Sequence, residues 1–151
     1  MSPAWIYHDL FPLNLKKSKS NNMQPGTSVM GLHLRCRLWI AEMNADTTVL
    51  RIFDDYINEM SAKKSGPEVR AGIKHFHSMF EQFRRDSDEL RHELHLLKMQ
   101  LAALARDNKT IADVNGLDGH QDTIRKRYTS YRKEFDAAKY EFDIFENKWL
   151  S

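Results

Sequence analysis

Residues 67 to 105 decide the fold, and they read PEVRAGIKHFHSMFEQFRRDSDELRHELHLLKMQLAALA. Apolar residues recur here at alternating steps of four and three, so their stripe returns to one side of a helix about every 3.5 residues. The stripe consists of Val69, Ile73, Phe76, Phe80, Phe83, Ser87, Leu90, Leu94, Leu97, Leu101 and Leu104. Ser87 is its only polar member. The stretch predicts one long amphipathic helix in a bundle or coiled coil.

The same spacing occurs before and after this stretch. Upstream it includes Leu32, Cys36, Trp39, Met43, Asp46, Leu50, Phe53, Ile57 and Met60. Downstream it includes Ile124, Tyr128, Tyr131, Phe135, Ala138, Phe142, Phe145 and Trp149. The first link is so short that the helices it joins must be antiparallel. We predict an all-α fold, an antiparallel three-helix bundle with helices at about 32–62, 67–106 and 118–150.

Two residue pairs at the predicted helix starts resemble capping pairs. Ser65 and Glu68 have the S-x-x-E spacing, in which the serine accepts a bond from a helix amide and the glutamate bonds back. Asp118 and Gln121 have a similar spacing. We therefore expect Ser65 and Asp118 to cap the second and third helices.

The first 31 residues differ in composition from the rest of the chain. An aromatic and aliphatic cluster is followed by a polar, basic stretch at 16–24, and prolines interrupt any helical period. We predict a flexible tail over 1–31 and a bundle domain over 32–151. Two alternatives stay open: the tail docks on a partner or a membrane surface, or translation starts later, at Met23 or Met30.

Composition and charge exclude several classes of protein. The formal net charge of +2 is too small to predict nucleic-acid binding by itself. Cys36 is the only cysteine, so it can form neither an intramolecular disulfide nor a cysteine-based zinc site. No run approaches the roughly 18 apolar residues that span a bilayer, and the N-terminus lacks the pattern of a secretory signal. We predict a cytoplasmic protein with no membrane span and no cofactor.

Asp46 and Ser87 are the polar members of the predicted core stripes. A buried carboxylate must be paired, hydrated or protonated, and Arg84 and Lys139 flank the stripes at about the height of Asp46. We interpret both residues as buried polar positions that set the register of the helices. A functional carboxylate is the alternative, although no second acid matches Asp46 in position. Cys36 lies on a stripe and is interpreted as an inert, buried thiol.

Glu89 and His92 form a Glu-x-x-His pair, a motif that ferritin-like di-iron bundles carry on two of their four helices. His95 lies one turn from His92, where the two rings could share an exposed metal ion. Only three long helices are predicted here, and a stripe through Leu90 and Leu94 points His92 away from the core. We therefore predict no catalytic residue, cofactor site or metal ligand, and keep a metal-dependent bundle enzyme using Glu89 and His92 as an alternative.

The third predicted helix carries a cluster of basic residues. They are Arg125, Lys126, Arg127, Arg132 and Lys133, and Asp122, Glu134 and Asp136 stand among them. Charges of both signs are typical of an ordinary solvated face. We predict no nucleic-acid partner for this face.

Two stretches carry a resemblance to known proteins. One spans residues 68–93 and contains DELRHE, and the other spans 135–149 and reads FDAAKYEFDIFENKW, with Trp39 and Glu42 upstream. Over residues 38–150 the chain resembles a family of small, uncharacterised, all-helical proteins of Bacteroidetes-type bacteria. The resemblance implies a bacterial, cytoplasmic helical bundle. It implies no activity, cofactor or site residue.

Three large apolar residues, Ile52, Leu96 and Ile144, project from the helices outside the predicted core stripes. They are candidates for a partner surface, although scattered surface apolarity is normal. We interpret the chain as a non-enzymatic structural or protein-interaction module that acts through helix faces or self-association. Besides the metal enzyme, a further alternative is binding of the lysine-bearing tail to membrane or nucleic acid, which would weaken with salt.

Overall fold

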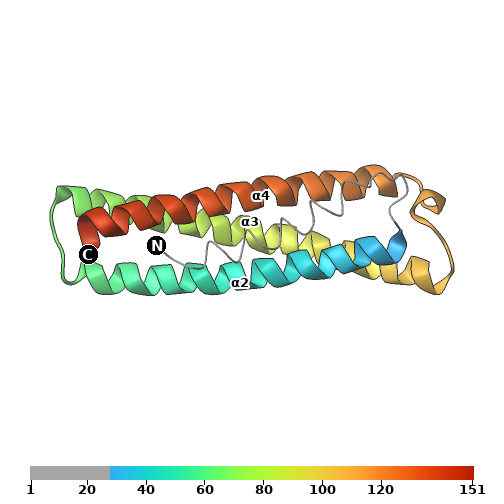
Figure 1. The fold of residues 1–151 in the computed structure, drawn as a ribbon, viewed down its shortest axis with the longest axis horizontal. Helices are drawn as coiled ribbons and strands as arrows, with labels where there is room; N and C mark the ends of the chain where they lie inside the picture. Colours follow the sequence, from blue (N-terminus) through green and yellow to red (C-terminus); the bar gives the residue numbers. More distant parts are fainter. Residues whose placement is uncertain (1–27) are drawn as a thin grey trace.

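The structure is a computed structural model, and it describes residues 28–151. These residues form three long helices, α2 (Val29–Ser61), α3 (Pro67–Arg106) and α4 (Leu117–Phe145). Two short elements, the 3-10 helix η1 (Ile111–Asp113) and the π-helical turn η2 (Glu146–Leu150), precede and follow α4. The long helices lie side by side in one elongated bundle (Figure 1). The predicted all-α three-helix bundle is confirmed.

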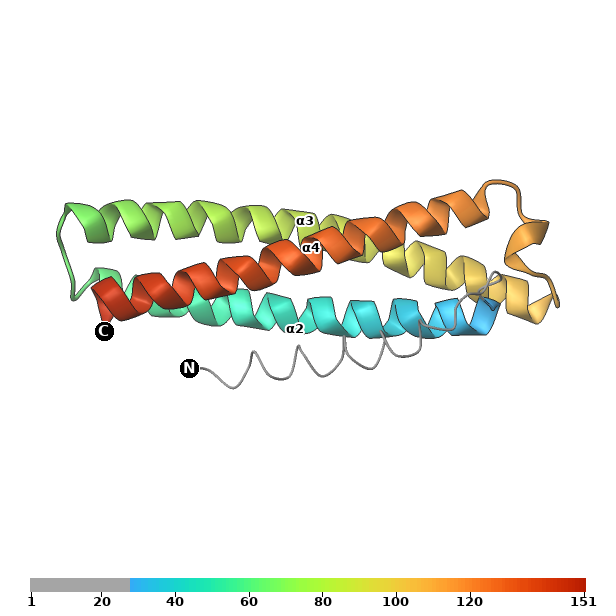
Figure 2. The ribbon, with the colours of Figure 1, turned by 45° about the horizontal axis from the view of Figure 1, so that its top comes forward.

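The helices alternate in direction along the bundle. α3 runs antiparallel to α2 and α4, and α4 crosses the other two at a slant (Figures 1 and 2). α2 and α3 pack most closely, whereas α4 meets α2 through large side chains. Trp39 stacks on Tyr128 with ring centroids 5.1 Å apart, and Phe53 packs on Phe142 at 4.6 Å. Within residues 28–151 no helix is both long and apolar enough to cross a membrane.

The bundle begins at residue 28, before the predicted boundary at 32. The Ser28 hydroxyl accepts a hydrogen bond from the Gly31 amide at 2.9 Å, so it caps α2 and starts the helix at Val29. The bounds of α3 agree with the predicted 67–106. The rest of the predicted tail, residues 1–27, lies outside the described residues.

Both expected capping residues are wrong, because glycines with positive φ occupy the cap positions. Gly66 precedes α3 with φ 129°, and Gly116 precedes α4 with φ 81°. The chain reverses direction at these points through backbone conformations that side chains disfavour. Gln121 donates to Asp118 at 3.0 Å inside the first turn of α4, so that pair braces the helix and does not cap it.

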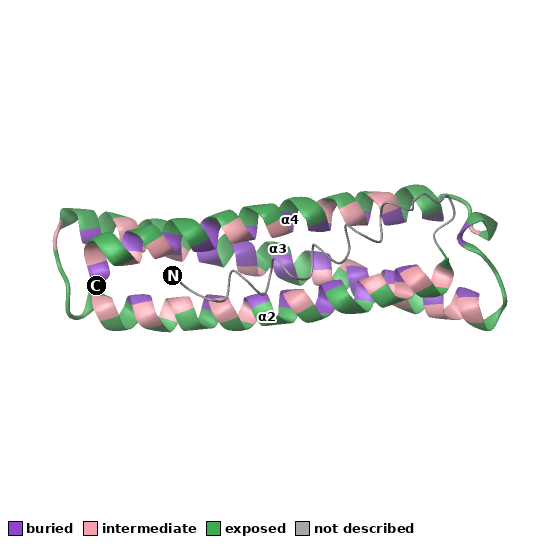
Figure 3. Ribbon diagram, in the orientation of Figure 1, coloured by how far each residue is buried: buried purple, intermediate pink, exposed green. Residues whose placement is uncertain are grey.

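The core follows the three predicted stripes along the inner faces of the helices (Figure 3). Most stripe residues are buried, and a few near the periphery are partly buried: Phe53, Met60, Ile73 and Trp149. Aromatic rings fill the end of the bundle next to the α2–α3 loop. There Phe76 packs against Phe142 and Phe145, with centroids 5.2 Å away in each case. Edge-to-face and tilted ring pairs of this kind stabilise a core beyond the area that they bury.

Gly72 lets α3 approach this aromatic end. A Cβ built on Gly72 would overlap Cε1 and Cζ of Phe145, so the Phe145 ring lies directly against the α3 backbone. The ring also packs against Phe76 and Phe142, which a shift of the ring would disturb. The missing side chain at position 72 therefore sets how closely α3 and the end of α4 pack.

Gly72→Ala is expected to lower the free energy of unfolding by about 1–3 kcal/mol, because the added methyl group overpacks the core. The opposite sign is expected from helix propensity alone, which favours alanine by up to about 1 kcal/mol. Urea unfolding followed by circular dichroism measures the difference. Gly119→Ala is the matched control, since nothing lies within 4 Å of its Cβ position in α4. Unchanged or increased stability of Gly72→Ala would show that Phe145 is free to move.

Candidate functional site

An ion pair is buried between α2 and α4. Arg132 donates from Nη1 to Asp46 Oδ1 at 3.1 Å and from Nη2 to Asp46 Oδ2 at 2.6 Å. The Asp46 side chain is 1% exposed and that of Arg132 is 12% exposed. The two parallel hydrogen bonds match the planar guanidinium to the carboxylate and fix their relative orientation. Asp46 thus has the partner that a buried carboxylate requires.

Further polar groups surround Arg132. Its Nη2 donates to the Tyr128 hydroxyl at 3.2 Å, and that hydroxyl donates to Glu42, whose Oε1 lies 3.8 Å from Arg132 Nε. On its other side, Asp136 Oδ1 lies 3.6 Å from Arg132 Nη1 and 3.6 Å from Lys139 Nζ. We call these residues the buried charge cluster: Glu42, Asp46, Tyr128, Arg132, Asp136 and Lys139.

Burial and neighbouring charges have opposite effects on the pKa values of the two cations in the cluster, Arg132 and Lys139. Burial acts to lower the pKa of Arg132, but the hydrogen bonds and charge of Asp46 outweigh it and raise that pKa above its usual value. Burial lowers the pKa of Lys139, and the charges of Asp136 and Asp46 offset only part of this effect. Burial also raises the pKa of Tyr128, so its hydroxyl keeps its proton. The cluster is therefore held together by Arg132 as a permanent cation.

The prediction of which basic residues lie near Asp46 is partly wrong. Arg84 does not reach Asp46, because its Nη2 pairs with Asp54 at 2.5 Å. Lys139 does lie in the cluster and is 4% exposed. The sequence predicts a solvated basic face for Arg132, and this prediction is wrong, because Arg132 is the central cation of the buried charge cluster. A signal for this was available, since Arg132 directly follows the stripe residue Tyr131. However, the sequence does not show which flank of the α4 stripe faces α2, because this depends on how the three helices are arranged.

Ser87 and Cys36 are both buried in the core. Ser87 is 1% exposed on α3 and lies near the Tyr131 hydroxyl of α4. Burial raises the pKa of Tyr131, the charge of Asp46 adds to the rise, and Ser87 opposes it. Cys36 is fully buried, and burial raises the pKa of its thiol to about 11. At neutral pH it is a protonated thiol and a poor nucleophile.

The residues of the Glu-x-x-His motif lie on the surface of α3. The Glu89 side chain is 72% exposed and its Oε1 lies 3.8 Å from Nη2 of Arg127. His92 and His95 are exposed on the same helix. Partial burial, followed by the charges of Lys98 and Arg91, lowers the pKa of His95. Within residues 28–151, no group of three or more His, Cys, Asp or Glu side chains is arranged to hold a metal ion.

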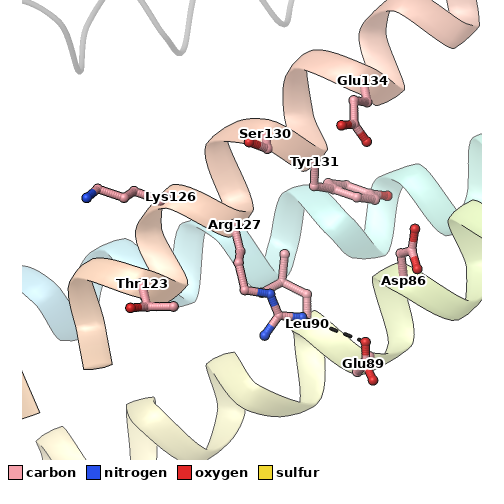
Figure 4. Close-up of a pocket in the computed structure, with 9 residues that line it drawn as sticks. All are labelled: Asp86, Glu89, Leu90, Thr123, Lys126, Arg127, Ser130, Tyr131 and Glu134. Carbon is pink, nitrogen blue, oxygen red and sulfur yellow. Dashed lines mark ion pairs between the residues drawn. The ribbon is translucent and has the colours of Figure 1, made fainter. Parts of the chain in front are cut away.

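A surface hollow of about 470 Å³ lies between α3 and α4 (Figure 4). It is lined by Asp86, Glu89, Leu90, Thr123, Lys126, Arg127, Ser130, Tyr131 and Glu134. Lys126 and Arg127 lie on one side of it and Asp86 and Glu134 on the other, and the Glu89–Arg127 ion pair joins the two sides. Because charges of both signs line the hollow, it favours neither an anionic nor a cationic ligand. The ion pair instead links α3 to α4.

A row of exposed, uncharged side chains runs along the face of α2 opposite its buried stripe. We call it the α2 outer row, and its members are Met30, Leu34, Leu38, Ala41, Ala45, Thr48 and Ile52. The steps between them are three or four residues, so all seven lie on one side of the helix. Met30 and Ile52 are each 57% exposed, and Leu34 is 50% exposed. At 1.5 Å per residue the row is about 33 Å long.

The three predicted surface residues are all exposed, but the structure does not bring them together. Ile52 belongs to the α2 outer row. Leu96 lies with Met99 on α3, and Ile144 lies with Tyr140 on α4. The other members of the row were not predicted to be a surface patch. The sequence does contain a signal for the row, because α2 carries a second set of apolar residues at helical spacing, offset by two residues from Leu32 and Cys36.

Arg132→Met and Asp46→Leu are each expected to lower the free energy of unfolding by about 3–5 kcal/mol, because each leaves a buried charge without its main partner. The double variant should cost much less than the sum, since it removes both charges. Denaturant unfolding of all three proteins measures this coupling. Lys63→Met, in an ion pair that is 62% exposed on both sides, is the control and should change stability by less than about 1 kcal/mol. Additive effects would mean that the buried pair is not coupled.

Comparison with known proteins adds no family to these observations. No protein-family model, curated protein or solved structure matches the chain. The resemblance to small helical proteins of Bacteroidetes-type bacteria therefore stays a prediction, and the function has to follow from the geometry of the bundle and its surfaces.

Proposed function

We propose that this chain is a non-enzymatic protein-interaction module that binds through the α2 outer row. The observation that carries the proposal is the continuity of the row. Exposed apolar residues that occur singly are normal on a protein surface, whereas a contiguous patch marks an interaction site. Six of the seven members are apolar and all seven are exposed over about six turns of helix.

The form of the row suits recognition of another helix. Helices bind helices through side chains at steps of three and four residues, which the row provides along its whole length. Its small residues, Ala41 and Ala45, lie near the middle, where a partner backbone can approach closely. Its larger residues, Leu34 and Ile52, lie toward the two ends and offer apolar anchors.

The use of charge elsewhere in the bundle supports the same proposal. Asp46 and Arg132 pair across α2 and α4, and Lys139 lies 3.6 Å from Asp136 within α4. On α3, Glu89 and Glu93 both face Arg127 of α4. These acidic and basic groups therefore help to hold the helices together, whereas the members of the α2 outer row are exposed within residues 28–151.

The proposal is tested by replacing Leu38 with a photoreactive benzophenone amino acid in the full chain, in cells that express it. We expect covalent adducts on irradiation, and we expect Leu34→Glu to abolish them because it places a charge in the row. The matched control carries the same probe at Leu96, an exposed leucine of α3 that is 52% accessible.

Mass spectrometry then identifies the adducts, and circular dichroism verifies that each variant is folded. Adducts to an identified protein at position 38, absent at position 96 and lost in Leu34→Glu, support the module. Equal yields at the two positions, or none at position 38, would overturn it.

A further inference from the structure

We infer that the partner of the α2 outer row is the same row on a second copy of this chain. The two α2 helices would lie antiparallel, with a twofold axis passing next to Ala41. The inference rests on the proposed function and assigns the occupant of that surface. In such an isologous contact, residue i of one copy meets residue j of the other, and j meets i.

The sizes of the side chains fit this arrangement. With Ala41 facing Ala41, each other member meets the member at the mirrored place in the order of the row. Leu38 then lies against Ala45, Leu34 lies against Thr48, and Met30 lies against Ile52. Near the axis a large side chain therefore meets a small one, which fills space without crowding. A parallel, in-register pair would instead place Ala41 on Ala41 and Ala45 on Ala45, so that two neighbouring layers would lack a large side chain.

The charges beside the row are compatible with the same register. Arg37 and Arg51 flank it on one side. In the antiparallel pair Arg37 lies across from the segment around Asn44 and Ala45, and Arg51 lies across from the segment around Gly31. No arginine therefore faces its counterpart, so like-charge repulsion does not oppose the contact.

The length of the row sets the strength of the contact. A strip about 33 Å long and about 12 Å wide covers on the order of 400 Å² on each copy, or about 800 Å² in total. This is below the range of stable interfaces and is typical of weak, reversible ones. We therefore expect a concentration-dependent dimer that dissociates on dilution.

Sedimentation velocity of the full chain between about 1 and 500 µM tests the dimer, a range around the micromolar affinity of weak complexes. The mass of the wild type should rise from 17.8 kDa toward twice that value. Leu38→Glu should stay monomeric at every concentration, and Leu96→Glu, the matched control on α3, should still associate. A wild type that is monomeric throughout, or association that Leu38→Glu leaves intact, overturns the inference.

Cysteine cross-linking tests the register, and the buried Cys36 does not interfere. Ala41→Cys should form a disulfide-linked dimer under mild oxidation. Leu34→Cys and Thr48→Cys should do so only when the two variants are mixed. A dimer that forms from Thr48→Cys alone and not from the mixture would indicate a parallel pair and would overturn the antiparallel register.

These measurements separate the inference from the proposed function on which it rests. A monomeric chain whose Leu38 photoadducts contain a different, identified protein overturns the second copy and leaves the interaction module standing. A monomeric chain without specific adducts at Leu38 overturns both. Photoadducts between two copies of the chain support both.

Discussion

The ion pair between Asp46 and Arg132 is the constraint on which the arrangement of α2 and α4 depends. Apolar stripes with a regular period tolerate sliding, because a shift by one heptad again places apolar residues opposite one another. A buried carboxylate and guanidinium do not tolerate it, since a displaced pair loses its two parallel hydrogen bonds inside the core. We therefore expect the pair to set the axial position of α4 on α2.

Aromatic packing, like the ion pair, fixes the position of α4 in the bundle. α4 lies farther from α2 than α3 does, and large groups such as Trp39, Tyr128 and Phe142 bridge the space. At the end of the bundle the close approach of Phe145 to Gly72 draws α4 against α3. The two contacts act at different levels of the bundle, so together they limit both sliding and splaying of α4.

α2 differs from the other helices in carrying an apolar row on each of two opposite sides. One side supplies Cys36, Met43 and Leu50 to the core, and the other presents the α2 outer row. A helix buried on one side needs only one apolar stripe. Within residues 28–151 the second row lies opposite the core and remains exposed, which is the basis for proposing it as the binding face.

The amino-acid sequence by itself determined that the chain forms long helices, which residues line their inner faces, and where α3 begins and ends. It could do so because helical periodicity and glycine and proline breaks act locally. Only the tertiary structure decided which flanks of the stripes meet. The apolar stripes are compatible with either order of the three helices around a common axis. Until that order is known, Arg132 and Arg84 are equally good candidates to pair with Asp46. The tertiary structure also decided which residues occupy the cap positions. The conformation of Gly66 depends on the direction in which α3 starts after the turn.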